Sequence, residues 1–155
     1  MLQQAQEKAL VTTGDVCYKL VKPLTEARKC AYIETLDASL VGNATCFISH
    51  AWRYDLYDSV DVMRQVEKEK PGTVFWFDLV VNNQHDTSAR PFEWWCSTFQ
   101  KSIERIGSVV LVLSPWNNPI PLTRSWCLFE IMSSFNVKGV DFRIRMPTHQ
   151  QQSFV

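Results

Sequence analysis

The chain has 155 residues, of which 46% are hydrophobic and 21% are charged, and this length and composition predict one globular domain with a sizeable core. Its 16 basic residues balance 16 acidic ones, which argues against a nucleic-acid-binding surface or attachment to acidic membranes. No apolar run approaches the roughly 20 residues that a membrane-spanning helix needs, and no secretory leader is recognisable.

The first 43 residues predict a helical extension that precedes the main domain. Residues 3–10 are strong helix formers, and an apolar stripe over residues 16–24 is interrupted at Pro23. A second short helical segment covers residues 25–36. No residue pattern in this extension indicates chemistry, so we expect it to act as a packing or linker arm.

Strand and helix patterns alternate over residues 44–147, which we take as the main domain, and residues 148–155 predict a tail without a core signal. An alternation of this kind predicts an α/β fold with a parallel sheet and helices on both faces. We expect strands at residues 46–52, 73–78, 109–113 and 140–146, helices at 56–68, at 92–106 and from about 124 to 137, and a loop at 82–88.

The stretch over residues 109–135 contains the first candidate site. A strand buried on both faces leads into a proline-rich loop and then into a helix, for which Thr123 or Ser125 is the predicted N-cap. Trp126 and Glu130 are four residues apart, so they share one face of this helix. That face lies opposite an apolar stripe that comprises Leu128, Ile131, Met132 and Phe135. Because ligands of open α/β sheets bind beyond the carboxyl ends of the strands, we expect the site here.

Four segments of the chain resemble motifs of the TIR (Toll/interleukin-1 receptor) domain family, and they occur in the expected order. Residues 47–50 (FISH) and 75–78 (FWFD) resemble the first two strand motifs of that family, and residues 110–115 (VLVLSP) resemble the third. Residues 125–130 (SWCLFE) are similar to the S-x-W-C-L-x-E pattern of the plant-type and algal-like branch. The resemblance covers roughly residues 44–146.

This resemblance implies a flavodoxin-like fold and, for the branch with this glutamate, NAD⁺ nucleosidase activity. The family fold has five parallel strands, whereas this chain supplies four, so we expect the N-terminal arm or a partner chain to cover the free sheet edge. Arginines that often follow the first strand motif are replaced by Ala51 and Trp52, with Arg53 one position later. The resemblance implies a catalytic role for Glu130 and a substrate-binding role for Ser49, His50, Trp52, Asp78 and Trp126.

Our first hypothesis is a cytoplasmic NAD⁺ nucleosidase that releases nicotinamide and ADP-ribose, or a cyclic isomer, and is activated by self-association in signalling or defence. The Glu130 carboxylate would stabilise positive charge on the ribose in the transition state. NAD⁺ is then the substrate, and no cofactor is expected. The second hypothesis is a non-catalytic module that assembles with other TIR domains. A third is another N-glycosidic enzyme, similar to nucleoside deoxyribosyltransferases.

Other reactive side chains carry weaker signals. The five cysteines form no C-x-x-C pair, so we expect reduced thiols, and Cys127 lacks a nearby histidine to activate it as a nucleophile. His85 and His149 have no metal-ligand spacing, and no glycine-rich phosphate loop is present. His50 could transfer a proton or form a structural hydrogen bond. Asp78 could bind substrate or accept hydrogen bonds from loop N–H groups.

Overall fold

The computed structural model describes residues 1–86 and 91–154 and contains a four-stranded parallel sheet in the order β2-β1-β3-β4. β1 (Cys46–Ser49) pairs with β2 (Phe75–Trp76) on one side and with β3 (Ser108–Val112) on the other. β4 (Asp141–Arg145) pairs with β3, with Val110 opposite Arg143. The predicted α/β fold with a parallel sheet is therefore confirmed. The chain leaves β1 toward β2 and later returns to the opposite side of β1, which opens a crevice beyond the carboxyl ends of these strands.

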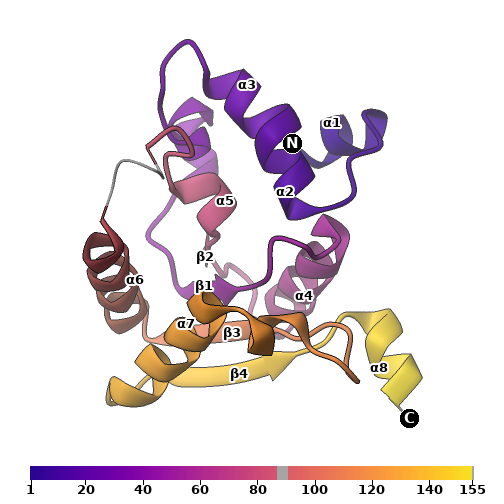
Figure 1. Ribbon diagram of the computed structural model, residues 1–155, viewed down its shortest axis with the longest axis vertical. Coiled ribbons are helices and arrows are strands. Elements are labelled where there is room, and N and C mark those ends of the chain that lie inside the picture. The colour runs from indigo at the N-terminus through magenta and orange to yellow at the C-terminus, as the bar shows by residue number, and fades with distance from the viewer. Residues whose placement is uncertain (87–90, 155) are drawn as a thin grey trace.

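Helices cover both faces of the sheet, as Figure 1 shows. α4 (Leu56–Glu69) packs on the face that carries Ile48 and Val110, and α6 (Phe92–Ile106) packs on the face that carries Phe47 and Val109. The side chains of a strand alternate between faces, so Ser49 falls on the same face as Phe47. α7 (Ser125–Asn136) packs beside α6 and against β4, and it therefore lies on the side of the sheet to which the Ser49 side chain points.

The predicted helical extension is present, and it shares the core of the sheet. α1 (Leu2–Glu7) is followed by a continuous helical run, which consists of α2 (Thr13–Val16), the π-helix η1 (Cys17–Val21) and α3 (Lys22–Thr25). Two 3₁₀ turns come next, η2 (Tyr32–Thr35) and η3 (Ala38–Leu40). Val16, Leu20 and Val21 belong to the same buried cluster as Ile48 of β1. We call residues 12–41 the N-terminal arm. Pro23 does not interrupt this run, because the π-turn before it changes the hydrogen-bond register and proline is tolerated in the first turn of α3.

The second strand is shorter than predicted. β2 ends at Trp76, and Asp78 is the first residue of a short helix, α5 (Asp78–Val81), rather than the last residue of a strand. Because β2 is an edge strand, its only ladder partners are Cys46 and Phe47 of β1, and the chain beyond Trp76 folds back through bonds from Val80 and Val81 to the Phe77 carbonyl. The predicted loop at 82–88 is described as far as residue 86, and its last two residues lie outside the described part of the chain.

The predicted tail is a helix, α8 (Thr148–Phe154). Its first N–H donates to Asp61 Oδ2 of α4 at 2.6 Å, and the ring of Phe154 lies 5.2 Å from that of Trp116. These contacts join residues more than 35 positions apart, so local composition gave no sign of them. Residue 155 lies outside the described part.

Two expectations are corrected here, about the N-cap of α7 and about the free sheet edge, and the exposure of one face of α7 is a further finding. Neither Thr123 nor Ser125 caps α7, because its N-cap position is Arg124 and the Thr123 hydroxyl donates to the Ile120 carbonyl instead. The apolar stripe of α7 is exposed, with Phe135 at 72% and Met132 at 63% of their accessible surface. The N-terminal arm does not cover β4, since it lies at the other end of the molecule, near α5 (Figure 1).

Among the described residues, no helix has the length and apolar character required to cross a membrane.

Candidate active site

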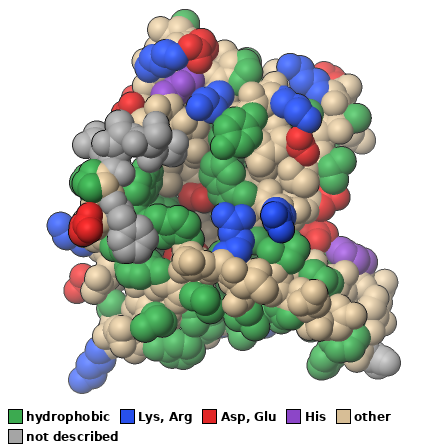
Figure 2. Space-filling model, viewed as in Figure 1, with side chains coloured by type: hydrophobic (Ala, Val, Ile, Leu, Met, Phe, Trp, Pro, Cys, Tyr) green, Lys and Arg blue, Asp and Glu red, His purple; other side chains and the backbone are tan. Residues whose placement is uncertain are grey.

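A cavity of about 500 Å³ lies at the carboxyl ends of β1 and β2, and the predicted site residues meet there. Figure 2 shows a hollow near the middle of this face, with basic side chains beside it. The loop after β1, the start of α5, α6, α7 and the N-terminal arm all contribute to its walls. Of the six predicted residues, His50, Trp52, Asp78, Trp126 and Glu130 line the cavity, and the sixth, Ser49, contacts Glu130 directly.

Glu130 is the central ionisable group of the cavity. Its side chain points toward the sheet, only 6% of the residue is exposed, and the Ser49 hydroxyl donates a hydrogen bond to its carboxylate. Burial raises the pKa of Glu130 to about 8, although the Ser49 hydrogen bond and the charge of Arg124 act in the opposite direction. At neutral pH the carboxyl group is therefore mostly protonated, and a cation placed beside it would lower its pKa.

His50, Trp52 and Asp78 form a second group of polar side chains in the cavity. The indole N–H of Trp52 donates to Asp78 Oδ2 at 2.7 Å, whereas His50 Nδ1 lies 3.7 Å from Asp78 Oδ1, which is beyond hydrogen-bond range. Burial lowers the pKa of His50, so its ring is neutral. Within the described chain, His50 Nε2 and Asp78 Oδ1 are buried and have no hydrogen-bond partner. Such atoms suit the hydroxyl groups of a ligand.

An aromatic wall completes the cavity. The ring of Trp126 lies 5.7 Å from that of Phe99 at an interplanar angle of 29°, and Trp95 also lines the space. Trp126 and Glu130 face the same cavity, as their four-residue spacing predicts, while Leu128 between them points outward. A flat heterocycle could stack on this wall while its attached sugar lies near Glu130.

Sequence reasoning missed the contribution of the N-terminal arm. Cys17, Tyr18 and Lys22 line the cavity, and Lys22 Nζ lies 5.7 Å from the centre of the Tyr18 ring. The arm is held there by a hydrogen bond of 2.8 Å between Thr25 Oγ1 and His85 Nε2. No local motif marks these residues, because contacts with residues about 40 to 60 positions away bring them to the site.

Arg124 was also missed, although it directly precedes the SWCLFE segment. Its half-buried side chain lines the cavity, and its charge lowers the pKa of both His50 and Glu130. Lys22 and Arg124 are thus two cations at a cavity whose acidic residues are Asp78 and Glu130. This arrangement accommodates a ligand that combines anionic groups with a centre of positive charge.

The thiol of Cys127 is not an activated nucleophile. Burial raises its pKa to about 12, and its sulfur lies 3.5 Å from the His50 carbonyl oxygen. Within the described ranges, no cluster of three or more His, Cys, Asp or Glu side chains could hold a metal ion.

Comparisons of the chain with protein-family models, with curated proteins and with solved structures find no match. The fold and the site by themselves define the class of molecule: a parallel α/β protein with a carboxyl–tryptophan pocket at the carboxyl ends of its central strands.

Proposed function

We propose that the protein is a TIR-type NAD⁺ nucleosidase with Glu130 as its catalytic residue. The observation that carries the proposal is the buried Glu130 carboxyl group, held by Ser49 and placed on the same cavity wall as Trp126. A buried carboxyl group with a raised pKa, in a cavity with an aromatic wall, is typical of a site that stabilises a developing cation.

In this reaction the bond between the ribose C1′ and the pyridinium nitrogen breaks, and its electron pair leaves with nicotinamide. The remaining ribosyl cation is stabilised by the Glu130 carboxylate. Water then adds to C1′ and loses a proton, so that NAD⁺ and water give nicotinamide, ADP-ribose and H⁺. If a nitrogen of the adenine ring attacks C1′ instead of water, the product is a cyclic ADP-ribose. His50 Nε2, which has no protein partner within the described residues, is available to bond a ribose hydroxyl.

Lys22 and Arg124 favour a dinucleotide over a plain nucleoside as the substrate. Both cations line the cavity that contains Glu130, and a diphosphate is the group that they would neutralise. A nucleoside deoxyribosyltransferase-like reaction would leave them without an anionic partner from the substrate.

The test is nicotinamide release from NAD⁺ by the purified protein and by Glu130→Gln. The amide keeps the shape of the side chain but cannot carry negative charge, so we expect a loss of at least about 100-fold in kcat/KM. The matched control is Glu104→Gln on the exposed side of α6, which should retain full activity. Full activity in Glu130→Gln would refute the site, and no release by the wild type at any protein concentration would refute the enzyme.

A second function, homotypic assembly with other TIR domains in cytoplasmic signalling or defence, is favoured by a separate observation. An apolar surface on α7 and the neighbouring β4 edge remains exposed, comprising Leu128, Met132, Phe135 and Ile144. We expect sedimentation equilibrium to show self-association that Met132→Lys abolishes. Leu24→Lys, at an exposed leucine of the arm, is the matched control. A wild type that stays monomeric at high concentration would refute this function.

A further inference from the structure

A second cavity, of about 850 Å³, lies at the β2 edge of the sheet, on the other side of α5 from the candidate active site. Its walls come from β2 and its flanks, from α4, from the end of α6 and from the N-terminal segment. Binding cavities for small molecules usually measure about 300–1,000 Å³ and are mostly apolar with a few polar groups. This cavity falls within that description.

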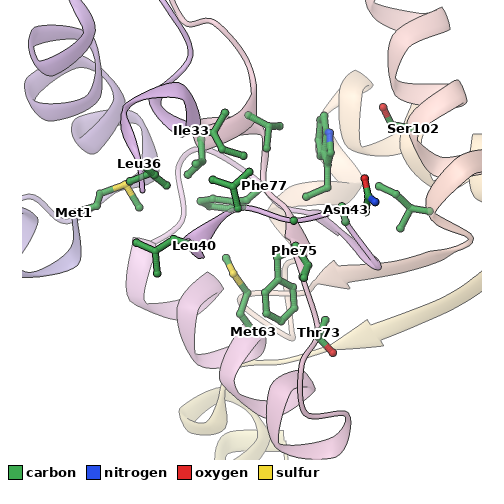
Figure 3. A pocket seen from close by; sticks show the side chains of 18 of the residues that line it. Met1, Ile33, Leu36, Leu40, Asn43, Met63, Thr73, Phe75, Phe77 and Ser102 are labelled. Carbon is green, nitrogen blue, oxygen red and sulfur yellow. The ribbon is translucent and has the colours of Figure 1, made fainter. Parts of the chain in front are cut away.

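Polar and apolar side chains are unevenly distributed along this second cavity. In Figure 3, Met1, Leu36 and Leu40 lie at one end, and Asn43 and Ser102 lie at the other. Between these ends the walls are formed by apolar side chains of α4 and β2, including Met63 and Phe75.

Arg105 is the one charged side chain in the lining, and it comes from α6, one turn after Ser102. Within the described part of the chain, its guanidinium group has no hydrogen bond or ion pair. The cavity thus combines a long apolar wall with a single charged side chain, and no group among the described residues neutralises that side chain.

We propose that this cavity binds a long-chain carboxylate, with the acyl chain along the apolar wall and the carboxylate at Arg105. The single charged side chain complements a monoanion, and the planar N–H groups of its guanidinium match the two oxygens of a carboxylate. A peptide fits less well, because the apolar lining would leave most of its backbone N–H and C=O groups without partners. A cationic amphiphile would place like charges together at Arg105.

Phe77 lies between the second cavity and the candidate active site and contacts residues of both. Phe77 lines the second cavity, and its ring lies 4.5 Å from that of His50 in the active site. The next residue, Asp78, lines the active site itself. A bound acyl chain would therefore contact the segment that carries Asp78. The binding proposal itself does not depend on NAD⁺ cleavage.

The experiment is isothermal titration of the full chain with palmitate below its aggregation concentration, compared with laurate and with hexadecyltrimethylammonium. We expect one palmitate per chain, and weaker binding of laurate because each buried methylene changes the affinity by about four-fold. We also expect the cationic probe to bind more weakly than palmitate.

The variant is Arg105→Glu, with Lys101→Glu as its control, since Lys101 is an exposed cation on the same helix that does not line the cavity. Arg105→Glu should weaken palmitate binding by about five-fold or more and reverse the preference for the anionic probe, whereas Lys101→Glu should change neither. Circular dichroism verifies that both variants are folded. No binding of palmitate to the wild type, or equal affinities in wild type and Arg105→Glu, would overturn the proposal.

Discussion

In the proposed reaction Glu130 must be charged, yet its carboxyl group lies where burial disfavours charge. Its burial raises its pKa to about 8, so the free protein holds it mostly neutral at pH 7. A substrate that brings its own positive charge stabilises the carboxylate, and binding then releases a proton. The same side chain is therefore neutral before a cationic substrate binds and ionised afterwards.

If the protein cleaves NAD⁺ as proposed, the pH dependence of that cleavage should reflect this ionisation. Because the free protein must lose the Glu130 proton, kcat/KM is expected to rise with pH and to level off above about 8. Ser49→Ala removes the hydrogen bond that lowers the pKa of Glu130, so the midpoint should move to higher pH, by about one unit. Initial rates between pH 5 and 10 provide the measurement. A profile that is flat over this range, or a midpoint that moves down in Ser49→Ala, would contradict the assignment.

The same pKa also predicts a stability effect. The folded chain keeps the Glu130 proton up to about pH 8, whereas the unfolded chain loses it near the ordinary glutamate pKa, so the wild type loses stability as the pH rises through that window. Glu130→Gln carries no such proton. Its stability relative to wild type should grow between pH 4 and 9 by at most about 5 kcal/mol. Urea unfolding at several pH values measures the difference, and Glu104→Gln, at an exposed glutamate, should show no comparable growth.

At the scale of elements, the N-terminal arm differs most from its prediction, because the sequence indicated only a packing or linker arm and the structure places it in the core and at the cavity. Leu20 is 2% exposed and lies in the main core cluster, although the arm carries no motif. The arm also joins the β1–α4 loop through an antiparallel bridge between Thr12 and Asp55, and Thr13 N–H donates to the Tyr54 carbonyl at 3.0 Å. The arm therefore forms one wall of the candidate active-site cavity, and it is anchored at several points.

Leu20→Ala should lower the free energy of unfolding by about 2–4 kcal/mol, because it leaves a cavity in the shared core. Leu24→Ala is the matched control: Leu24 lies in the same helical run but is 49% exposed, so the loss should stay below about 0.5 kcal/mol. Urea denaturation of both variants gives the comparison. Equal losses would show that the arm is not packed as described.

The elements predicted best from sequence are those with a strong local pattern. α6 repeats its apolar residues over four turns and is followed by Gly107, whose φ of 69° suits glycine. In β3, the residues from Val109 to Val112 are a continuous run of buried apolar residues, three of them valines. The elements predicted poorly depend on distant contacts. β2 is short because it is an edge strand with two ladder pairs, and α8 forms where Asp61 accepts its first N–H across 87 positions.

The apolar stripe of α7 shows a different limit of sequence reasoning. Periodicity identifies which residues share a face, and Trp126 and Glu130 do lie opposite Met132. Periodicity does not decide which face is buried, and here the helix buries Cys127, Glu130 and two serines while Met132 is exposed. The candidate site residues could thus be grouped from the sequence, but the cations Lys22 and Arg124 could not be added to them.

At the scale of the whole molecule, the arm and the sheet should unfold together. Val16 and Val21 of the arm share one buried cluster with Ile48 and Val110 of the sheet, so neither part has a complete core alone. We expect tryptophan fluorescence and far-ultraviolet circular dichroism to give coincident urea transitions. Leu20→Ala should move both transitions equally. Two separate transitions, with only the first sensitive to Leu20→Ala, would show that the arm folds independently.

The packing of the arm also has a consequence for biosynthesis. Residues 13–25 are translated before the strand at 46–49 and the helix at 78–81 that cover them. Ribosomes add roughly 5–20 residues per second, so the apolar side of the arm stays without its native partners for on the order of several seconds. During that interval Leu20 and Val21 are available to chaperones or to neighbouring nascent chains. The arm is therefore synthesised early, but it packs against its native partners only after Leu79 has left the ribosome.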